Sequence, residues 1–354
     1  RGRIIAITGS NGKTTTTSLV GAILDAAGLE NIVCGNIGRP FAEVVQEISP
    51  DGYAVLEVSN FQLEAIEEFA PHIAMILNLT PDHLDRYDGF EDYCKAKYRI
   101  AENQRATDYL ILNADDPVID RTTITTEAQK IYFSTSRPWP VGVSQRGKSL
   151  IGIVGGIEYN IIDINQIRIP GPHNLQNAAA ASLAGLLLGI TPEQIAHALR
   201  NFPGVPHRME DAGTVAGIRF VNDSKATNVD SVCYALRSID TPIILIGGGR
   251  DKGGSYQPIA EYGKGKIKQL ILIGEAREKM FDALGKIFPV QFAASMDAAV
   301  RKAFDAAAPG EPVLLSPACS SFDMFKNYEQ RGEVFKQLVA GLKNGNHSTH
   351  EVKA

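Results

Sequence analysis

Residues 4–15 read Ile-Ile-Ala-Ile-Thr-Gly-Ser-Asn-Gly-Lys-Thr-Thr, which is an apolar run, a glycine-containing turn and then Gly-Lys-Thr. A buried strand that leads through such a turn into a helix presents backbone amides, a helix N-terminus and a cation, as a bound phosphate requires. The strict motif has a glycine five residues before Gly12, and Ile7 stands there instead. The stretch therefore predicts a phosphate-binding loop of irregular form, with Lys13 on the phosphates and the Thr14 hydroxyl on Mg²⁺.

Apolar β-type runs and helical stretches alternate along the first half of the chain. The predicted strands are 4–8, 54–58, 73–79 and 109–113, and the predicted helices are 14–27, 62–69, 90–103 and 174–189. This alternation favours a doubly wound parallel α/β sheet of the phosphate-loop ATPase type, with helices on both faces. Residues 131–169 contain short β-like runs broken by Gly and Pro, which predicts a hairpin excursion.

A turn-rich segment, residues 201–206, interrupts this pattern with two prolines and a glycine and predicts a linker. Beyond it the predicted strands are 218–221, 243–247, 269–274 and 313–316. We therefore predict two domains, residues 1–204 and a smaller Rossmann-like α/β domain at 205–354.

Composition excludes several classes of protein. The 354 residues are 44% hydrophobic with a net charge of −5, and no Lys/Arg block stands out, so no broad surface for nucleic acid or anionic membrane is expected. The longest nearly apolar run, 178–190, is too short to span a bilayer. The four cysteines form no metal or disulfide pattern, which favours a reducing cytoplasm.

Candidate metal ligands follow two predicted strands. Glu57 ends the run 54–58, at the carboxyl end of a parallel strand, where ligands bind in such sheets. Residues 78–86 follow the next strand and gather His83 with two aspartates and an arginine. Because Mg²⁺ prefers oxygen ligands, the sequence predicts a magnesium site at this edge, with a functional role for His83.

Several of these segments together resemble the Mur ligase family, and the irregular phosphate loop is the form that this family uses. The segments are 8–15, 35–38, 56–64 and 82–86. Three further segments, 207–208, 222–228 and 316–332, resemble the members that add D-glutamate, and the similarity runs essentially from end to end. Asn60 departs from the usual serine of those members.

The resemblance implies ATP and two Mg²⁺ ions as cofactors. The nucleotide-binding residues that it implies are Gly9, Asn11, Gly12, Lys13, Thr14, Thr15, Asn174, Asn177, Arg208 and Asp223. In that set Asn177 reads adenine, Asp223 contacts ribose and Arg208 contacts the γ-phosphate. Without the family, Asn174 reads as a helix N-cap. The implied metal ligands are Thr14, Glu57, His83 and Lys97, the last as a CO₂-derived carbamate.

The resemblance also implies the reaction. The substrates are UDP-N-acetylmuramoyl-L-alanine and D-glutamate, joined through an acyl phosphate by a cytoplasmic monomer. The implied catalytic residues are Lys13, His83, Lys97 and Lys225, and the implied substrate-binding residues are Asn36, Ser59, Thr227, Lys252, Ser321 and Tyr328. Within the second set, Thr227, Lys252 and Ser321 hold the glutamate carboxylates.

Three other readings stay open. Family members normally carry a uridine-nucleotide-binding domain before the phosphate loop, and the start at Arg1 leaves no obvious place for it. The chain is then either a ligase without that domain or an ATP-binding fragment that is inactive without it. A folylpolyglutamate-synthase-like glutamate ligase is the second alternative. A plain phosphate-loop ATPase or kinase is the third, and it leaves the predicted amino-acid site unexplained.

Overall fold

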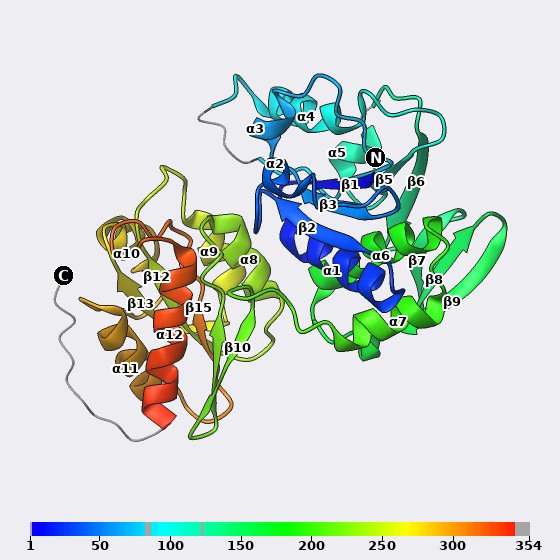
Figure 1. Cartoon of the computed structure of the whole chain (residues 1–354). Coiled ribbons are helices and arrows are strands. Elements are labelled where there is room, and N and C mark those ends of the chain that lie inside the picture. The colour runs from blue at the N-terminus through cyan, green and yellow to red at the C-terminus, as the bar shows by residue number, and fades with distance from the viewer. Residues whose placement is uncertain (1, 82–85, 122–123, 344–354) are drawn as a thin grey trace. The chain divides into compact units, whose positions relative to one another are not determined.

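The computed structural model describes residues 2–81, 86–121 and 124–343, which form two compact units (Figure 1). The first unit is Arg1–Pro203 and the second is Gly204–Ala354. No helix within the described residues has the length and apolar character that crossing a membrane requires.

The described strands of the first unit form one mostly parallel sheet. They are β1 (Arg3–Thr8), β2 (Asn31–Gly35), β3 (Tyr53–Glu57), β4 (Ile73–Ile76), β5 (Tyr109–Asn113), β6 (Gln129–Ser134), β7 (Gly142–Arg146), β8 (Ser149–Val154) and β9 (Ile157–Asp163). Their order is β2-β3-β1-β4-β5-β6-β7-β8-β9, parallel from β2 to β7 and antiparallel from β7 to β9. The doubly wound α/β fold is thereby confirmed, and the predicted hairpin excursion is β7 to β9.

Helices cover both faces of this sheet, as Figure 1 shows. The helical segments of the first unit are α1 (Lys13–Ala26), α2 (Phe41–Val44), α3 (Asn60–Leu63), α4 (Phe90–Tyr98), η1 (Arg99–Ala101), α5 (Pro117–Arg121), η2 (Ile164–Gln166), α6 (Pro172–Leu187) and α7 (Pro192–Asn201). Helices α1, α6 and α7 lie together on one face, and α4 and α5 pack on the other. Because β1 lies between β3 and β4, the turn after it lies next to the carboxyl ends of both neighbouring strands.

The helix predicted over residues 62–69 is wrong beyond its first turn. Helix α3 ends at Leu63, and the carbonyls that would continue it bond to side chains instead. Arg99 donates to two backbone carbonyls of this segment, and Asn103 donates to two more. These side-chain hydrogen bonds compete with the backbone hydrogen bonds of a helix. No local sequence pattern predicts them.

The second unit is built on a smaller sheet. Its strands are β10 (Glu210–Val215), β11 (Ile218–Asn222), β12 (Ile243–Gly248), β13 (Ile267–Ile273), β14 (Val290–Phe292) and β15 (Val313–Leu315). Among the described residues the order is β10-β11-β15-β12-β13-β14, with an antiparallel β10-β11 pair at one edge and parallel pairing elsewhere.

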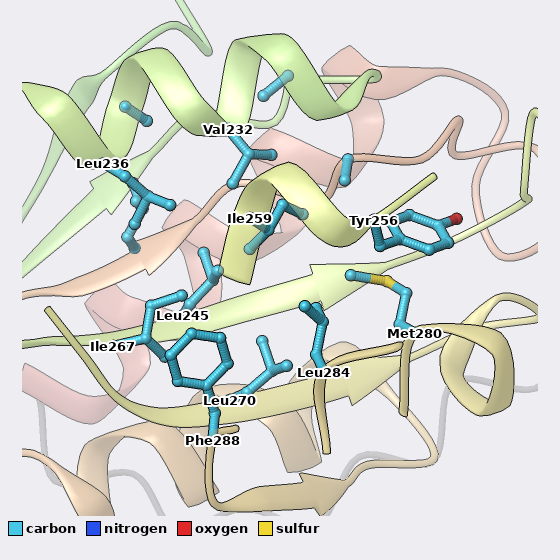
Figure 2. Close-up of a cluster of buried hydrophobic side chains, with 14 of the residues drawn as sticks. Val232, Leu236, Leu245, Tyr256, Ile259, Ile267, Leu270, Met280, Leu284 and Phe288 are labelled. Atoms are coloured by element: carbon cyan, nitrogen blue, oxygen red, sulfur yellow. The ribbon is translucent and has the colours of Figure 1, made fainter. Parts of the chain in front are cut away.

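Apolar side chains on both faces of this sheet hold the second unit together. Its helices are α8 (Val229–Arg237), α9 (Gln257–Gly263), α10 (Arg277–Leu284), α11 (Met296–Ala306) and α12 (Tyr328–Lys343). Figure 2 shows one core, in which Val232, Leu236 and Ile259 from helices meet Leu245 and Leu270 from strands. A second core lies under α11 and α12. Both sheet faces are therefore covered, as a Rossmann-like domain requires.

Candidate functional site

The predicted phosphate loop forms a tight turn between β1 and α1. Gly9 and Gly12 have φ angles of 150° and 83°, which side chains other than hydrogen rarely allow. Lys13 is the first residue of α1, and its Nζ donates to the carbonyls of Gly9 at 2.8 Å and Ser10 at 2.9 Å. The lysine therefore curls over its own loop, and its ammonium lies where a phosphate held by the turn would meet it.

Asn78 fixes the shape of this loop from the end of β4. Its Oδ1 accepts the backbone N–H of Asn11 at 2.8 Å, and its Nδ2 donates to the Asn11 carbonyl at 3.0 Å. The Ser10 N–H donates to the Asn78 carbonyl at 3.0 Å. This clamp was not predicted, although Asn78 heads the segment 78–86 that drew attention for its charged residues.

Asn177 contacts the opposite side of the loop. A Cβ added to Gly12 would lie 2.4 Å from Asn177 Oδ1, so only glycine fits there. The same oxygen accepts from the Thr16 hydroxyl at 3.2 Å. The prediction that Asn174 is a helix N-cap is wrong, because α6 begins at Pro172 after an N-cap at Gly171. Asn174 instead donates from Nδ2 to the carbonyl of Pro170, in the segment just before α6, at 2.8 Å.

Glu57 lies at the end of β3 with one carboxylate oxygen already used. Its side chain is only 3% exposed, and Asn36 Nδ2 donates to Oε1 at 2.9 Å. Gly35 allows this approach, because a Cβ there would lie 2.4 Å from the Glu57 carbonyl oxygen. The second oxygen, Oε2, is buried without a hydrogen-bond partner among the described residues. A buried, unpartnered carboxylate oxygen is costly unless a cation or donor meets it.

This arrangement fits a magnesium ion. Mg²⁺ is usually held through one or two carboxylates, with phosphate and water oxygens completing the octahedron. Glu57 Oε2 supplies such an oxygen, and Thr14 stands at the neighbouring helix N-terminus. Within the described residues no three His, Cys, Asp or Glu side chains gather into an all-protein metal site.

Lys97 lies on the inner side of α4 and reaches the phosphate loop. It is 1% exposed, and its Nζ donates to the Gly9 carbonyl at 3.1 Å. The ammonium also lies 4.8 Å from the centre of the Tyr93 ring, whose hydroxyl is 2.8 Å from Ser10 Oγ. From the sequence alone, Lys97 was interpreted as a solvent-exposed charge on a helix. In the structure it contacts the same loop as Lys13.

Three further residues drew attention at the carboxyl edge of the first sheet, namely His83, Ser59 and Asn60. His83 lies outside the described residues. Ser59 is the N-cap of α3 and exchanges hydrogen bonds with Gln62 in a capping box. Asn60 donates to the Tyr87 hydroxyl at 2.6 Å, which gives the position that departs from the family a defined local role.

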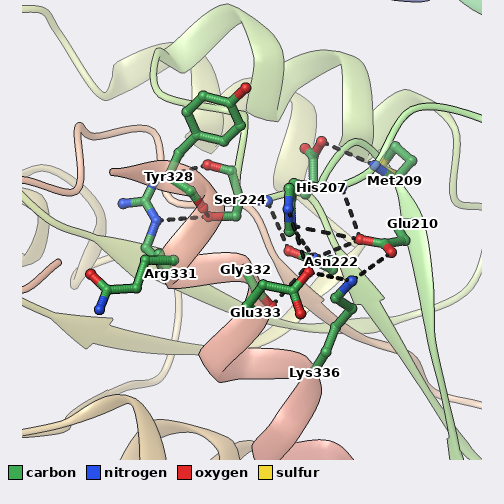
Figure 3. A network of polar contacts seen from close by, with 12 residues as sticks. His207, Met209, Glu210, Asn222, Ser224, Tyr328, Arg331, Gly332, Glu333 and Lys336 are labelled. Carbon is green, nitrogen blue, oxygen red and sulfur yellow. Dashed lines mark hydrogen bonds and ion pairs between the residues drawn. The ribbon is translucent and has the colours of Figure 1, made fainter. Parts of the chain in front are cut away.

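In the second unit, a buried polar network holds the segment that carries Arg208 (Figure 3). Asn222 Nδ2 donates to Glu210 Oε2 at 2.8 Å and lies 3.0 Å from His207 Nδ1. Lys336 Nζ donates to the other Glu210 oxygen at 2.9 Å. Burial tends to raise the pKa of Glu210, but the His207 backbone amide and Lys336 outweigh it and the pKa is lowered. Burial lowers the pKa of His207.

Asp223 follows β11 and is buried among hydrogen-bond donors. Only 4% of it is exposed, and its carboxylate accepts from Ser316 Oγ at 2.8 Å and from the Met209 N–H at 3.2 Å. Burial raises the pKa of Asp223 to about 6, even though Arg208 and these donors oppose the shift. At neutral pH, ionisation of the Asp223 carboxylate therefore costs folding free energy.

We expect Asp223→Asn to stabilise the second unit at pH 8 by about 1 to 3 kcal/mol. The folded state binds the Asp223 proton more tightly than the unfolded chain, so this carboxylate costs stability as pH rises from about 4 to about 6. The gain of the variant should therefore shrink as pH falls through that window. Urea unfolding of both proteins across pH measures it, with exposed Asp240→Asn as the control. Parallel pH profiles for the wild type and Asp223→Asn would contradict the prediction.

Two predicted substrate-binding residues of the second unit, Thr227 and Lys252, follow the ends of β11 and β12. Lys252 Nζ donates to Thr227 Oγ1 at 3.3 Å, which brings two residues 25 positions apart into contact. Lys225 Nζ lies 5.5 Å from the centre of the Tyr328 ring, and the Lys225 N–H donates to the His207 carbonyl at 3.0 Å. The pair Thr227 and Lys252 offers a hydroxyl and an ammonium to an anionic group.

Ser321, another predicted substrate contact, lies on the loop between β15 and α12. Behind this loop lies Arg331 of α12, which belongs to the resembling segment 316–332 but was assigned no role of its own. Arg331 is 1% exposed and donates to Ser224 and to the carbonyls of Cys319 and Ser320. Burial lowers the pKa of Arg331 to about 10. A buried guanidinium thus connects the two loops that carry the predicted amino-acid contacts.

Comparison with known proteins identifies the family. The Mur ligase middle domain matches residues 7–185, and the Mur ligase, glutamate ligase domain matches residues 207–319. The UDP-N-acetylmuramoylalanine--D-glutamate ligase of Thermoanaerobacter sp. (strain X514) is 46% identical over 96% of this chain and 76% of its own length. The enzyme of that name from Geotalea uraniireducens is 45% identical, with 97% and 75% covered.

Solved structures share the fold at low sequence identity. A pseudomurein peptide ligase type C from Methanothermus fervidus has a TM-score of 0.75 at 20% identity, covering 97% of this chain and 79% of that one. MurF ligase from Thermotoga maritima, solved in complex with ADP, has a TM-score of 0.71 at 16% identity, with 96% and 80% covered. Together with the domain matches and the 46% identical relative, these likenesses show that the chain belongs to the Mur ligase family.

Proposed function

We propose that this chain is an ATP-dependent ligase that joins D-glutamate to UDP-N-acetylmuramoyl-L-alanine, a step of peptidoglycan precursor synthesis. The observation that carries the proposal is the pairing of two sites in one chain that is 46% identical to ligases of that name. One site is the phosphate loop with Lys13 and Glu57, and the other is the Thr227–Lys252 pair.

The first unit would bind the nucleotide. Backbone amides of the loop and Lys13 would take the phosphates, and Asn174 and Asn177 would lie on the adenine side. Arg208 would contact the γ-phosphate, and Asp223 would contact the ribose. Glu57, Thr14, His83 and a carbamylated Lys97 would hold two Mg²⁺ ions. When bound, Mg²⁺ neutralises charge on the transferred phosphoryl group. The unpartnered Glu57 Oε2 supports the metal assignment.

The chemistry needs an activated carboxylate, because a carboxylate and an amine do not condense at neutral pH. The carboxylate of the L-alanyl group would attack the γ-phosphorus of ATP and release ADP. The amine of D-glutamate would then attack the acyl phosphate carbon, lose a proton and expel inorganic phosphate as the amide forms. Lys13 and Lys225 would supply positive charge where oxyanions develop, which is the main contribution of a protein to such steps.

The second unit would select the amino acid. The Thr227 hydroxyl, the Lys252 ammonium and Ser321 would hold the two glutamate carboxylates, and Tyr328 would border them. Asn36 and Ser59 would contact the other substrate from the first unit. The 3.3 Å contact between Lys252 and Thr227 supports this assignment, since it assembles a donor pair for an anion.

Phosphate release from Mg·ATP tests the proposal. We expect release to require both UDP-N-acetylmuramoyl-L-alanine and D-glutamate, with L-glutamate giving little. Equal use of L-glutamate would favour a folylpolyglutamate-synthase-like ligase. Release without either substrate would favour a simple ATPase, and ATP binding with no release would make the chain a nucleotide-binding fragment.

A further inference from the structure

Arg331 joins two loops that are far apart in the sequence. Its Nε and one terminal nitrogen donate to Ser224 Oγ at 2.9 Å and the Ser224 carbonyl at 2.8 Å (Figure 3). The two terminal nitrogens also donate to the Cys319 carbonyl at 3.1 and 3.2 Å, and one reaches the Ser320 carbonyl at 3.4 Å. One planar group therefore holds residues on both loops at fixed spacing.

The cost of burying this cation indicates that the bridge matters. Arg331 is almost wholly buried, and its hydrogen-bond acceptors are carbonyls and a hydroxyl. The carboxylates of Asp223 and Asp323 act on Arg331 electrostatically, but neither accepts a hydrogen bond from it among the described residues. An apolar side chain of similar volume would fill such a space at lower cost, so stability alone does not account for arginine here.

The two loops are the ones that carry the amino-acid contacts of the proposed function. They leave the carboxyl ends of β11 and β15, which are parallel neighbours. Thr227 lies three residues beyond Ser224, and Ser321 directly follows Ser320. The spacing between the Thr227–Lys252 pair and Ser321 is consequently set from behind by the Arg331 guanidinium.

We propose that Arg331 is a positioning residue for an acidic amino-acid substrate, which it serves by fixing the distance between these two loops. This proposal rests on the proposed ligase function. Its buried positive charge also raises the electrostatic potential on the side where two carboxylates would bind. Lysine cannot replace it, because an ammonium offers three donors from one point and no planar fork.

The test compares Arg331→Lys with Phe335→Leu. Phe335 is a fully buried core residue one turn further along α12, so its variant reports general loosening of the same helix. We expect Arg331→Lys to raise the KM for D-glutamate about ten- to a hundredfold, as the loss of charge-assisted hydrogen bonds predicts, with the KM for ATP changed less than about twofold. We expect both variants to lower the melting temperature by a similar amount. Phe335→Leu should leave the KM values for D-glutamate and ATP within about twofold of the wild type. Equal effects of the two variants on the D-glutamate KM would overturn the proposal.

Hydrogen exchange keeps the test independent of turnover. In the wild type, D-glutamate should slow amide exchange in residues 224–227 and 316–321 together, and in Arg331→Lys this joint protection should be lost. If the wild type released no phosphate but showed the joint protection, the ligase function would fail and the Arg331 proposal would stand. If D-glutamate protected neither segment in the wild type, the Arg331 proposal itself would be overturned.

Discussion

Lys13→Ala is expected to lower the rate of ATP-dependent phosphate release by about a thousandfold or more. The Lys13 ammonium lies over the Gly9 and Ser10 carbonyls, at the turn that would hold the transferred phosphoryl group. Removing it would leave the developing charge to the backbone amides alone. Steady-state phosphate release with saturating substrates measures the loss.

The same substitution should leave the first unit folded. Helix α1 is held by its buried residues Leu19, Ile23 and Leu24, which Lys13→Ala does not touch, and alanine is a good helix former. We expect unfolding free energies within about 1 kcal/mol of the wild type. Lys130→Ala, at an exposed position of β6, is the control for loss of a lysine. Retained turnover in Lys13→Ala would remove this residue from the site, whereas a parallel loss of stability would assign it a structural role.

Periodic and local patterns predicted the elements that build the site. The strand of residues 4–8, the glycines of the following turn and Gly-Lys-Thr are contiguous, so their meaning can be read from the sequence. Glu57 was predicted from its place at a strand end, and β3 ends at that residue, beside the phosphate loop strand β1. Order along a parallel sheet thus carries site information, because strand ends share one edge.

Contacts made across the fold could not be predicted in this way. Asn78, Asn177 and Arg331 act through partners 67, 161 and 107 residues away. Each looks like an ordinary loop or helix residue in the sequence, and each is defined by which backbone groups it meets in space. The failed helix over 62–69 has the same origin, because Arg99 and Asn103 bond to carbonyls of this segment that lie 35 and 36 residues away.

The burial of Lys97 is another contact across the fold that the sequence pattern did not predict. Helix α4 contains two lysines two positions apart, of which Lys95 is exposed and pairs with Asp92. Lys97 points inward to the Gly9 carbonyl. Burial of an ammonium costs free energy, and reaction of the neutral amine with CO₂ to give a carbamate would replace it with an anionic oxygen ligand suited to a hard cation.

We expect Lys97→Ala to lose about a hundredfold or more of its turnover and to regain part of it when a short carboxylate such as formate, acetate or propionate is added. The truncated side chain leaves space beside the phosphate loop, and a small acid in that space would supply the oxygens of the lost carbamate. Lys95→Ala, two positions away on the exposed side of α4, should keep full turnover and show no response to the acids.

The pattern of rescue separates a ligand from a structural lysine. A carbamate would be replaced best by the acid that fits the vacated volume, so the response should saturate and depend on the length of the acid. The wild type should also incorporate labelled bicarbonate at Lys97, and Lys97→Ala should not. If no acid restores turnover and no label is found, Lys97 acts as an ammonium that donates to the Gly9 carbonyl, and the proposed second Mg²⁺ would need oxygen ligands from other residues or from the substrates.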